Sequence, residues 1–346
     1  SGSINSVTYS NNGKYILSSS EDCTLKLWSV DTGKEIKMFG YQLIPVRAVF
    51  SPDNKMVIST SNDKNLILWD ISNGKKVTKF ERYPEGINSI RFSSDGRRVI
   101  CSSTDSSIIM WDVKTGKIIK IFKGHKGQVL SVSFSPEGKY IVSGGMDKII
   151  RLWDIDSGKE IKSFVGHNDC VSNLAFSPDG KYILSGSGYK SGRWLDFTIK
   201  LWDINSGKEM KTFNGHKFYI TSVAFSPDCK YIISGSADGT TRIWNISTGA
   251  WVAFMSHSNG KDWLIFDSEG YWDASRHGGD LVAMVKGMDC WNIDQFAIKN
   301  NRPDLILAKL PNPDKNLISE YNRQYKKRIA KLEKLYNIKE SDLTSD

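Results

Sequence analysis

The chain has 346 residues, with 47 Lys and Arg against 38 Asp and Glu, which leaves a formal net charge of +9. Its hydrophobic fraction of 39%, taken with 29 glycines, is that of an ordinary folded protein and excludes a disordered or collagen-like chain. No apolar run reaches the roughly 18 residues that a bilayer span requires, and the first residues lack a secretory signal. We therefore expect a cytoplasmic protein with no membrane partner.

The cysteines give no indication of a metal site or of disulfide chemistry. Their number is odd, they lie far apart, and no two form a C-x-x-C pair: Cys23, Cys101, Cys170, Cys229 and Cys290. We expect a reducing compartment, no metal and no cofactor.

The clearest feature of the sequence is an internal repeat. A tryptophan recurs at intervals of 41 or 42 residues, with one interval of 49, at Trp28, Trp69, Trp111, Trp153, Trp202 and Trp244. The longer interval places a seven-residue insertion between Phe176 and Trp202.

Each repeat predicts four short strands separated by turns. Between Val129 and Phe164, the β-prone stretches VLSVSF, KYIVSG, IIRLWDI and EIKSF alternate with the turn sequences SPEGK and DSGK. A four-stranded sheet cannot bury both of its faces alone, so successive repeats must stack face to face around an axis. The repeat therefore predicts a β-propeller.

The repeat resembles the WD40 family. The stretches FSPDGKYILSG and TIKLWDINSGKEMKTFNGH, between Phe176 and His216, are close to the family pattern, which recurs over residues 4–255. The resemblance implies an all-β, seven-bladed WD40 β-propeller with a short C-terminal α-helical extension. We expect six repeats over residues 1–255, a degenerate seventh blade over 256–291, and a helical extension or linker over 292–346.

The resemblance also implies a buried polar set of His, Ser, Asp and Trp in each complete repeat. Three repeats match it: His125, Ser143, Asp147 and Trp153; His167, Ser185, Asp196 and Trp202; His216, Ser234, Asp238 and Trp244. A Ser/His/Asp grouping is also the composition of a hydrolase triad. Because the set recurs with a tryptophan in every case, we interpret it as a structural network and assign no catalytic residue.

A shorter resemblance covers residues 262–310. The stretches DWLIFDSEGYWDAS and IDQFAIKNNRPDLILAKL are similar to the segment that joins WD40 arrays to caspase-like cysteine peptidase domains in microbial multidomain proteins. The resemblance implies that an effector domain follows. The segment itself offers no catalytic dyad, because His277 and Cys290 are only 13 residues apart and no nucleophile motif surrounds the cysteine.

By the same family resemblance, a partner binds on the loops before the first strand and between the second and third strands. A propeller holds such loops in a fixed arrangement. Our candidate contact residues on this face are Tyr41, Tyr83, Lys126, Met146, Tyr189, Lys190, Arg193, Trp194, Phe218 and Tyr219. The insertion GYKSGRWL contributes aromatic and Arg side chains of the kind found at interface hot spots. The alternative is that Trp194 packs against the neighbouring blade and the insertion is a tolerated surface loop.

Three functional classes remain open, and the least favoured is a peptidase that would use Cys290. The first is a non-catalytic protein-interaction, sensor or regulatory module that binds a protein or peptide. The second is a nucleic-acid-binding propeller that uses its basic loops and tail, which the charge of +9 favours. The tail predicts a helix starting near Pro313, with an apolar stripe through Leu317, Tyr325 and Ile329. This helix either packs on the propeller or serves as a linker.

Overall fold

The computed structural model describes residues 2–40, 45–61, 64–189, 196–256, 261–275, 283–286, 289–292 and 300–336. The chain divides into two compact units, residues 1–223 and 224–346, which are described in turn.

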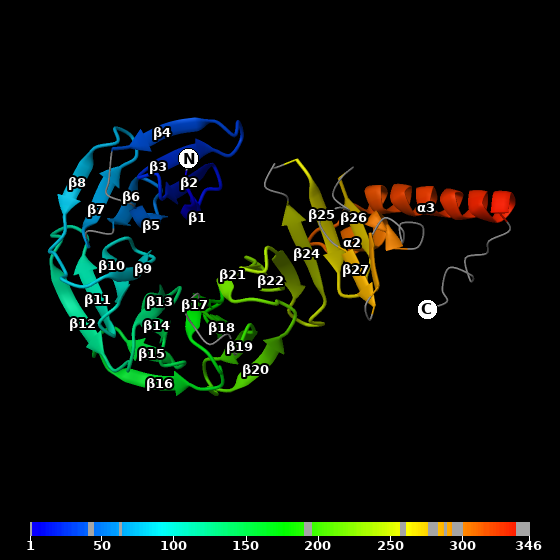
Figure 1. Cartoon of the computed structure of the whole chain (residues 1–346). Coiled ribbons are helices and arrows are strands. Elements are labelled where there is room, and N and C mark those ends of the chain that lie inside the picture. The colour runs from blue at the N-terminus through cyan, green and yellow to red at the C-terminus, as the bar shows by residue number, and fades with distance from the viewer. Residues whose placement is uncertain are drawn as a thin grey trace. The chain divides into compact units, whose positions relative to one another are not determined.

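The first unit contains five four-stranded antiparallel sheets, and each sheet follows the order of the chain. Figure 1 shows them in succession around an arc, with the first strand of each sheet innermost and the fourth outermost. The first two sheets consist of β1 (Ile4–Tyr9), β2 (Tyr15–Ser20), β3 (Leu25–Ser29), β4 (Glu35–Phe39), β5 (Pro45–Phe50), β6 (Met56–Ser61), β7 (Leu66–Asp70) and β8 (Lys76–Lys79). The next three consist of β9 (Ile87–Phe92), β10 (Arg98–Ser103), β11 (Ser107–Asp112), β12 (Ile118–Lys123), β13 (Val129–Phe134), β14 (Tyr140–Gly145), β15 (Ile150–Asp154), β16 (Glu160–Phe164), β17 (Val171–Phe176), β18 (Tyr182–Ser187), β19 (Ile199–Asp203) and β20 (Glu209–Phe213).

The recurring D-S-G-K turn joins the third and fourth strands of a blade. In the fourth blade, Gly158 has φ 73° and its amide donates to the carbonyl of Asp154 at 2.9 Å. Glycine reaches this left-handed conformation without steric cost. It also leaves room for the neighbouring blade, because a Cβ at Gly158 would lie 3.2 Å from Cδ of Lys120.

The core of the first unit lies between blades rather than within them. Each buried cluster combines side chains from two successive blades, for example Leu27 and Phe39 of the first blade with Trp69 of the second. Phe39 packs against Trp69, Phe122 against Trp153, and Phe164 against Trp202, with ring centroids 5.9–6.0 Å apart. The repeated tryptophan therefore buries its ring against the blade that precedes its own.

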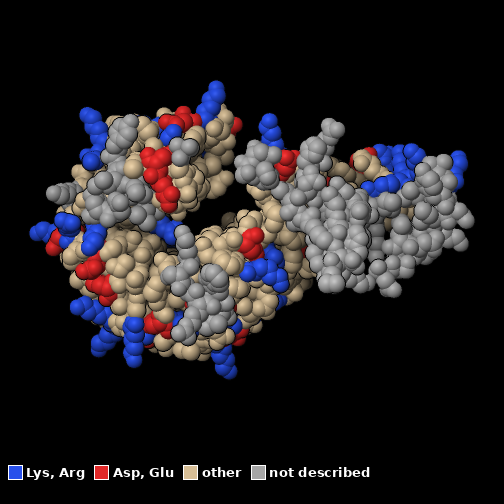
Figure 2. Space-filling view, viewed as in Figure 1, with Lys and Arg blue, Asp and Glu red and all other residues tan. Residues whose placement is uncertain are grey.

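A lysine on the outermost strand forms a second link between blades. Lys120 Nζ donates to the carbonyl oxygens of Ile155 and Asp156, in the next blade, at 2.9 and 2.6 Å. Lys37 and Lys162 make the equivalent pairs of bonds, at 2.6–2.9 Å. Figure 2 shows many Lys and Arg side chains along the outer edge of the first unit. At least three of these cations therefore serve to join the blades.

The second unit contains most of a sixth, larger sheet. Its strands follow in chain order: β21 (Ile220–Phe225), which spans the boundary between the units, β22 (Tyr231–Ser236), β23 (Thr241–Asn245), β24 (Trp251–Ser256), β25 (Trp263–Asp267) and β26 (Trp272–Ala274). The last two strands lie in the region predicted to form a seventh blade, but they extend the sixth sheet instead. The structure therefore shows six blades, and the seven-bladed prediction is wrong.

The composition of β24 explains why the sheet continues. In the earlier blades the outermost strand carries exposed charged residues, such as Glu160. In β24, by contrast, Val252 and Ala253 are 4% and 0% exposed. Ala253 pairs with Phe266 of β25 in an antiparallel ladder. An apolar edge strand is stabilised when another strand covers it, and β25 fills that place.

Beyond the sixth sheet lie a hairpin and two helices. β27 (Ala283–Lys286) and β28 (Asp289–Asn292) pair only with each other among the described strands. α2 (Pro303–Lys309) and α3 (Lys315–Tyr336) lie in the predicted helical extension, and α3 is the expected tail helix. Asp314 accepts the amides of Asn316 and Leu317 and so caps α3.

The two helices pack against each other through a buried polar contact. Asp304 of α2, 2% exposed, pairs with Arg302 at 2.7 Å and accepts a hydrogen bond from Asn322 of α3 at 3.0 Å. The guanidinium of Arg302 also lies 3.9 Å from the ring centroid of Tyr325. Lys309 joins α2 to the sheet through Asp267, at 2.7 Å.

The lysine link between blades can be tested by substitution. Lys120→Met keeps the length of the side chain but removes both bonds to the next blade. We expect the free energy of unfolding to fall by about 1 kcal/mol, measured by urea denaturation. The control is Lys117→Met, an exposed turn lysine whose side chain makes no described bond to the next blade. Equal effects of the two substitutions would contradict the assigned role.

Candidate functional site

The loops of the fourth blade are fixed by a chain of buried hydrogen bonds. Trp153 Nε1 donates to Ser143 Oγ at 2.8 Å, and this hydroxyl lies 2.7 Å from His125 Nε2. His125 Nδ1 lies 3.0 Å from the carboxylate of Asp147, which also accepts the amide of Lys126 at 3.1 Å. The network thus ties the loop before β13 to the turn after β14.

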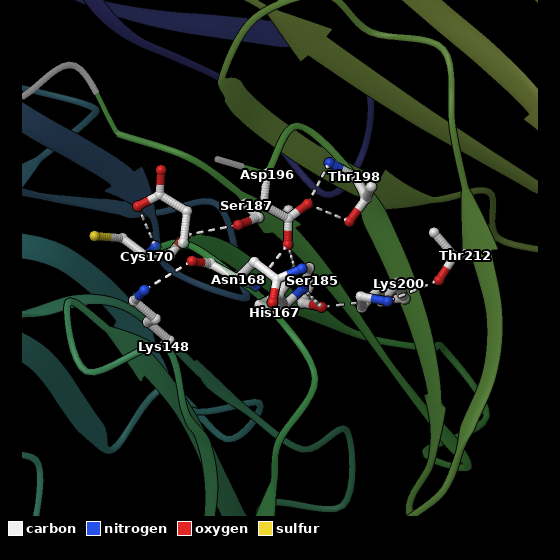
Figure 3. A network of polar contacts seen from close by, with 12 residues as sticks. Lys148, His167, Asn168, Cys170, Ser185, Ser187, Asp196, Thr198, Lys200 and Thr212 are labelled. Carbon is white, nitrogen blue, oxygen red and sulfur yellow. Dashed lines mark hydrogen bonds and ion pairs between the residues drawn. The ribbon is translucent and has the colours of Figure 1, made fainter. Parts of the chain in front are cut away.

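The fifth blade repeats this arrangement (Figure 3). Trp202 Nε1 donates to Ser185 Oγ at 2.8 Å, and His167 lies 2.7 Å from Ser185 and 2.9 Å from Asp196. Asp196 also accepts the amides of Asn168 and Thr198, at 3.0 and 2.9 Å. The network therefore closes across the seven-residue insertion and holds both ends of that loop.

The same bond directions serve both blades, and in the fourth blade Arg151 Nη1 also donates to Asp147 at 2.8 Å. The indole N–H donates to serine, the serine O–H can donate to Nε2 of histidine, and Nδ1–H then donates to aspartate. Ser143 and Ser185 are both 0% exposed. A hydrolase nucleophile must reach its substrate, so neither of these two Ser/His/Asp sets has the access that acyl transfer requires.

The other blades contain parts of the same network. The indole donates to a serine hydroxyl in three more blades, at 2.8–2.9 Å: Trp28 to Ser18, Trp69 to Ser59 and Trp244 to Ser234. His216 is 6% exposed, and Asp238 accepts the amide of Thr240 at 2.9 Å.

The third blade uses different partners. Cys101 occupies the serine position, and Trp111 Nε1 donates instead to the carbonyl oxygen of Glu81 at 3.0 Å. Tyr83 was predicted as a contact residue, but it is only 9% exposed. Its hydroxyl bonds to Asp105 and to Ser107. Tyr83 thus takes the structural place of histidine, because a phenol can both donate and accept, and it is not a surface residue.

Burial and hydrogen bonding together set the charge state of the two aspartates. Burial alone would raise the pKa of Asp147, but the bonds from His125 and the charge of Arg151 outweigh it and hold the pKa well below its ordinary value. At Asp196 burial would likewise raise the pKa, but the bonds from His167 and Thr198 outweigh it and again hold the pKa below its ordinary value. Both carboxylates are therefore charged at neutral pH and fix the loops around them.

An aromatic cluster lies beside the insertion. Phe197 stacks on Phe218 with ring centroids 5.9 Å apart, and Phe218 contacts Tyr219 at 5.2 Å. All three rings are half-buried. Gly188, at φ 95°, permits this approach, because a Cβ there would lie 2.7 Å from Cβ of Tyr219. Phe197 was missed from the sequence because it follows the turn residue Asp196, and the position after that aspartate was not among the contact candidates.

The remaining predicted contact residues fall into two groups. Lys126 is exposed, and Met146 and Tyr189 are half-buried. A Cβ built on Gly127 would lie 3.3 Å from Cβ of Met146, so the loop before β13 touches the turn after β14. The other four lie outside the described residues: Tyr41, Lys190, Arg193 and Trp194.

Neighbouring loops on this face are also bonded to each other. Lys148 of the fourth blade donates to the carbonyl of Asn168 in the fifth at 2.7 Å (Figure 3). The next residues are anchored too, because the carbonyl of Cys170 accepts from Gly188 N and Ser187 Oγ. Burial and the nearby Asp169 raise the pKa of the Cys170 thiol to about 11, so it is not a reactive thiolate.

The repeat, the stacked four-stranded blades and the shared polar network decide the family. The family model of the WD domain, G-beta repeat, matches residues 1–29, 34–70, 74–112, 116–154, 158–203 and 207–245. The chain belongs to the WD40 repeat family. WD40 propellers usually serve as protein-interaction modules and are typically non-catalytic scaffolds. A search among curated proteins found no match.

Two further properties bear on function. Of the described helices, α2 is too short to cross a bilayer and α3 is too polar. Within the described ranges, no three His, Cys, Asp or Glu side chains are grouped so that they could hold a metal ion.

The buried aspartates predict acid sensitivity. Their pKa values are lowered by folding, so their contribution to stability is complete above the unfolded value of about 3.9 and is lost as pH falls below it. We expect the free energy of unfolding of the wild type to decrease between pH 5 and pH 3, measured by urea denaturation. Asp147→Asn and Asp196→Asn should each show a smaller decrease over this range.

The control for this measurement is Asp156→Asn, an exposed turn carboxylate. It should retain the full acid dependence of the wild type. If the two network variants lost as much stability between pH 5 and pH 3 as Asp156→Asn, the buried aspartates would not be the titrating groups.

Proposed function

We propose that the protein is a non-catalytic interaction or regulatory module that binds a protein or peptide on the loops before β13, β17 and β21. The observation that carries this proposal is the half-buried aromatic cluster Phe197, Phe218 and Tyr219. The exposed Lys126 and the half-buried Met146 lie on the loops of the fourth blade. Aromatic and long side chains on a rigid surface lose little conformational entropy on binding, which suits an interface hot spot.

The hydrogen-bond networks support this proposal because they hold the loops in one geometry. The loop after His125 and the loop after His167 are each tied to an aspartate in the following turn. Lys148 then links the two blades. A partner that meets such a surface need not order it first, so less of the contact energy is lost on association.

The larger context of the module is part of the proposal. The resemblance of residues 262–310 to a linker preceding a caspase-like peptidase suggests that the propeller regulates an effector domain in the full protein. Within this region α2 is joined to β25 by the ion pair of Lys309 with Asp267. We further propose a reducing compartment such as the cytoplasm, in line with four described cysteines that are free thiols.

The nucleic-acid alternative ranks second. It rests on the charge of +9 and on the basic residues of the insertion and the tail. Three of the recurring lysines, Lys37, Lys120 and Lys162, are bonded to backbone carbonyls of the next blade. These cations are less available to phosphates than the net charge suggests. Binding to DNA or RNA that fell steeply between about 50 and 200 mM salt would favour this alternative.

The aromatic cluster gives a direct test of the loop face. The purified protein is used as bait in an extract of its source cells, and the affinity of the recovered partner is then measured with pure components. Phe218→Ala should weaken that affinity about 30-fold, as expected for an interface hot spot, with little change in melting temperature. Glu137→Ala, in an exposed turn at the opposite end of its blade, is the control and should bind normally. Normal affinity of Phe218→Ala together with weakened affinity of Glu137→Ala would place the partner elsewhere.

The insertion requires a separate test, since Arg193 and Trp194 lie outside the described residues. Each is replaced by Ala, and melting temperature and partner affinity are measured for both variants. If they contact the partner, melting is preserved and affinity is lost. A lowered melting temperature with normal affinity would show instead that Trp194 packs against a neighbouring blade.

A further inference from the structure

The innermost strands of the first unit line a hollow of about 950 Å³. Its wall is formed by residues of β1, β5, β9 and β17, with the first residues of β21. Hydroxyl groups of Ser6, Thr221 and Ser222 line it, and so do two cationic side chains, Arg47 of β5 and Arg91 of β9. No function assigned above involves this hollow.

The repeat shows that these arginines are not needed to build a blade. Strand pairing places Arg47 opposite Thr60, and the residues at the same register position in the other blades of the unit are Ser6, Ser89, Ser131 and Asn173. The position of Arg91, opposite Ile100, is held elsewhere by Thr8, Val49, Ser133 and Ala175. Only two adjacent blades therefore carry a large cation where their counterparts have small or neutral side chains.

The described contacts leave both guanidinium groups without a counter-charge. Arg47 Nε donates to the carbonyl of Asn88 at 3.2 Å, and Arg91 Nη1 donates to the carbonyl of Ile90 at 2.8 Å. Among the described residues, neither arginine forms an ion pair. A guanidinium has five N–H donors, so most of the donors of each side chain remain available.

The two charges also act on each other. Burial and, to a smaller extent, the nearby positive charge of Arg47 together lower the pKa of Arg91 to about 10. Burial lowers the pKa of Arg47 as well. Two unpaired, half-buried cations that repel each other destabilise a fold, and an anion between them would remove the repulsion.

We propose that this hollow is a binding site for a small, multiply charged oxyanion of the phosphate class, held by Arg47 and Arg91. The planar guanidinium presents paired N–H donors that match the oxygen atoms of a phosphate, and two such groups match an anion with two or more charges. The volume is in the range of small-molecule sites and accommodates an organic phosphate. The neighbouring hydroxyls can bond the rest of the ligand.

Calorimetric titration of the purified full chain with inorganic pyrophosphate tests this proposal. In about 150 mM NaCl, where surface charges are screened, we expect saturable binding with one site per chain. Arg47→Ser introduces the residue that other blades carry at the same register position, such as Ser6, and Arg91→Ala introduces the equivalent of Ala175. Both variants should therefore fold. Each should weaken binding tenfold or more. Arg97→Ala, in an exposed turn of the same blade as Arg91, removes the same charge and should bind like the wild type.

Melting temperatures without added anion provide a second measurement. Removing either arginine relieves repulsion, so the melting temperature of Arg47→Ser and Arg91→Ala should be equal to or above that of the wild type. A clear decrease in both variants would show that the arginines serve the fold and would overturn the proposal. Undetectable binding of pyrophosphate, or equal binding by all variants, would also overturn the proposal. Tighter binding of citrate than of pyrophosphate would overturn it too, because the site would then be one for carboxylates.

Discussion

A buried tryptophan, found in this arrangement in the second, fourth and fifth blades, is the constraint on which the structure depends. Its ring packs against the preceding blade, as Trp153 does against Phe122, while its indole N–H bonds to a serine of its own blade, Ser143. One side chain thus joins the hydrophobic contact between blades to the polar network within a blade. Since a buried indole N–H without a partner is costly, the serine position and the orientation of the ring fix each other.

The rest of the loop face follows from that fixed ring. The serine that accepts from tryptophan also bonds histidine, and histidine bonds the aspartate that orders the next turn. In the fifth blade the same sequence of bonds spans an insertion of seven residues, so the loop can vary while its ends stay in place. This division explains how a family with one framework presents different contact surfaces. In our proposal, recognition depends on side chains such as Phe218, whereas the geometry depends on the buried network.

The sequence predicted the parts of the structure that repeat and failed where repetition ends. The spacing of the tryptophans was sufficient to predict four-stranded blades and their stacking. Residues 256–291 were taken for a seventh blade because single positions still aligned, although the apolar strand Trp251–Ser256 indicated that the sixth sheet continues. The spacing of 28 residues from Trp111 places Tyr83 at the histidine position, but only the structure shows that its hydroxyl is bonded to Asp105 and Ser107 and that the residue is not a surface contact.

Other features could not be read from the pattern at all. α2 lies where no repeat constrains the chain, and the contact of Phe197 is with Phe218, a residue distant in sequence. Arg47 and Arg91 were visible as exceptions at otherwise small positions, yet only the strand register places them in one hollow. Departures from an internal repeat are therefore the positions most informative about function, once the fold shows where they meet.

Hydrogen–deuterium exchange of Ser143→Ala tests the central claim most directly. The substitution removes the partner of Trp153 Nε1 and of His125 Nε2 but removes almost no volume. The account predicts faster amide exchange in the loop around residues 124–128 and the turn around 146–149, with the first and second blades unchanged. If exchange in these loops stayed at the wild-type rate, the polar network would not be what holds the loop face, and the account would be contradicted.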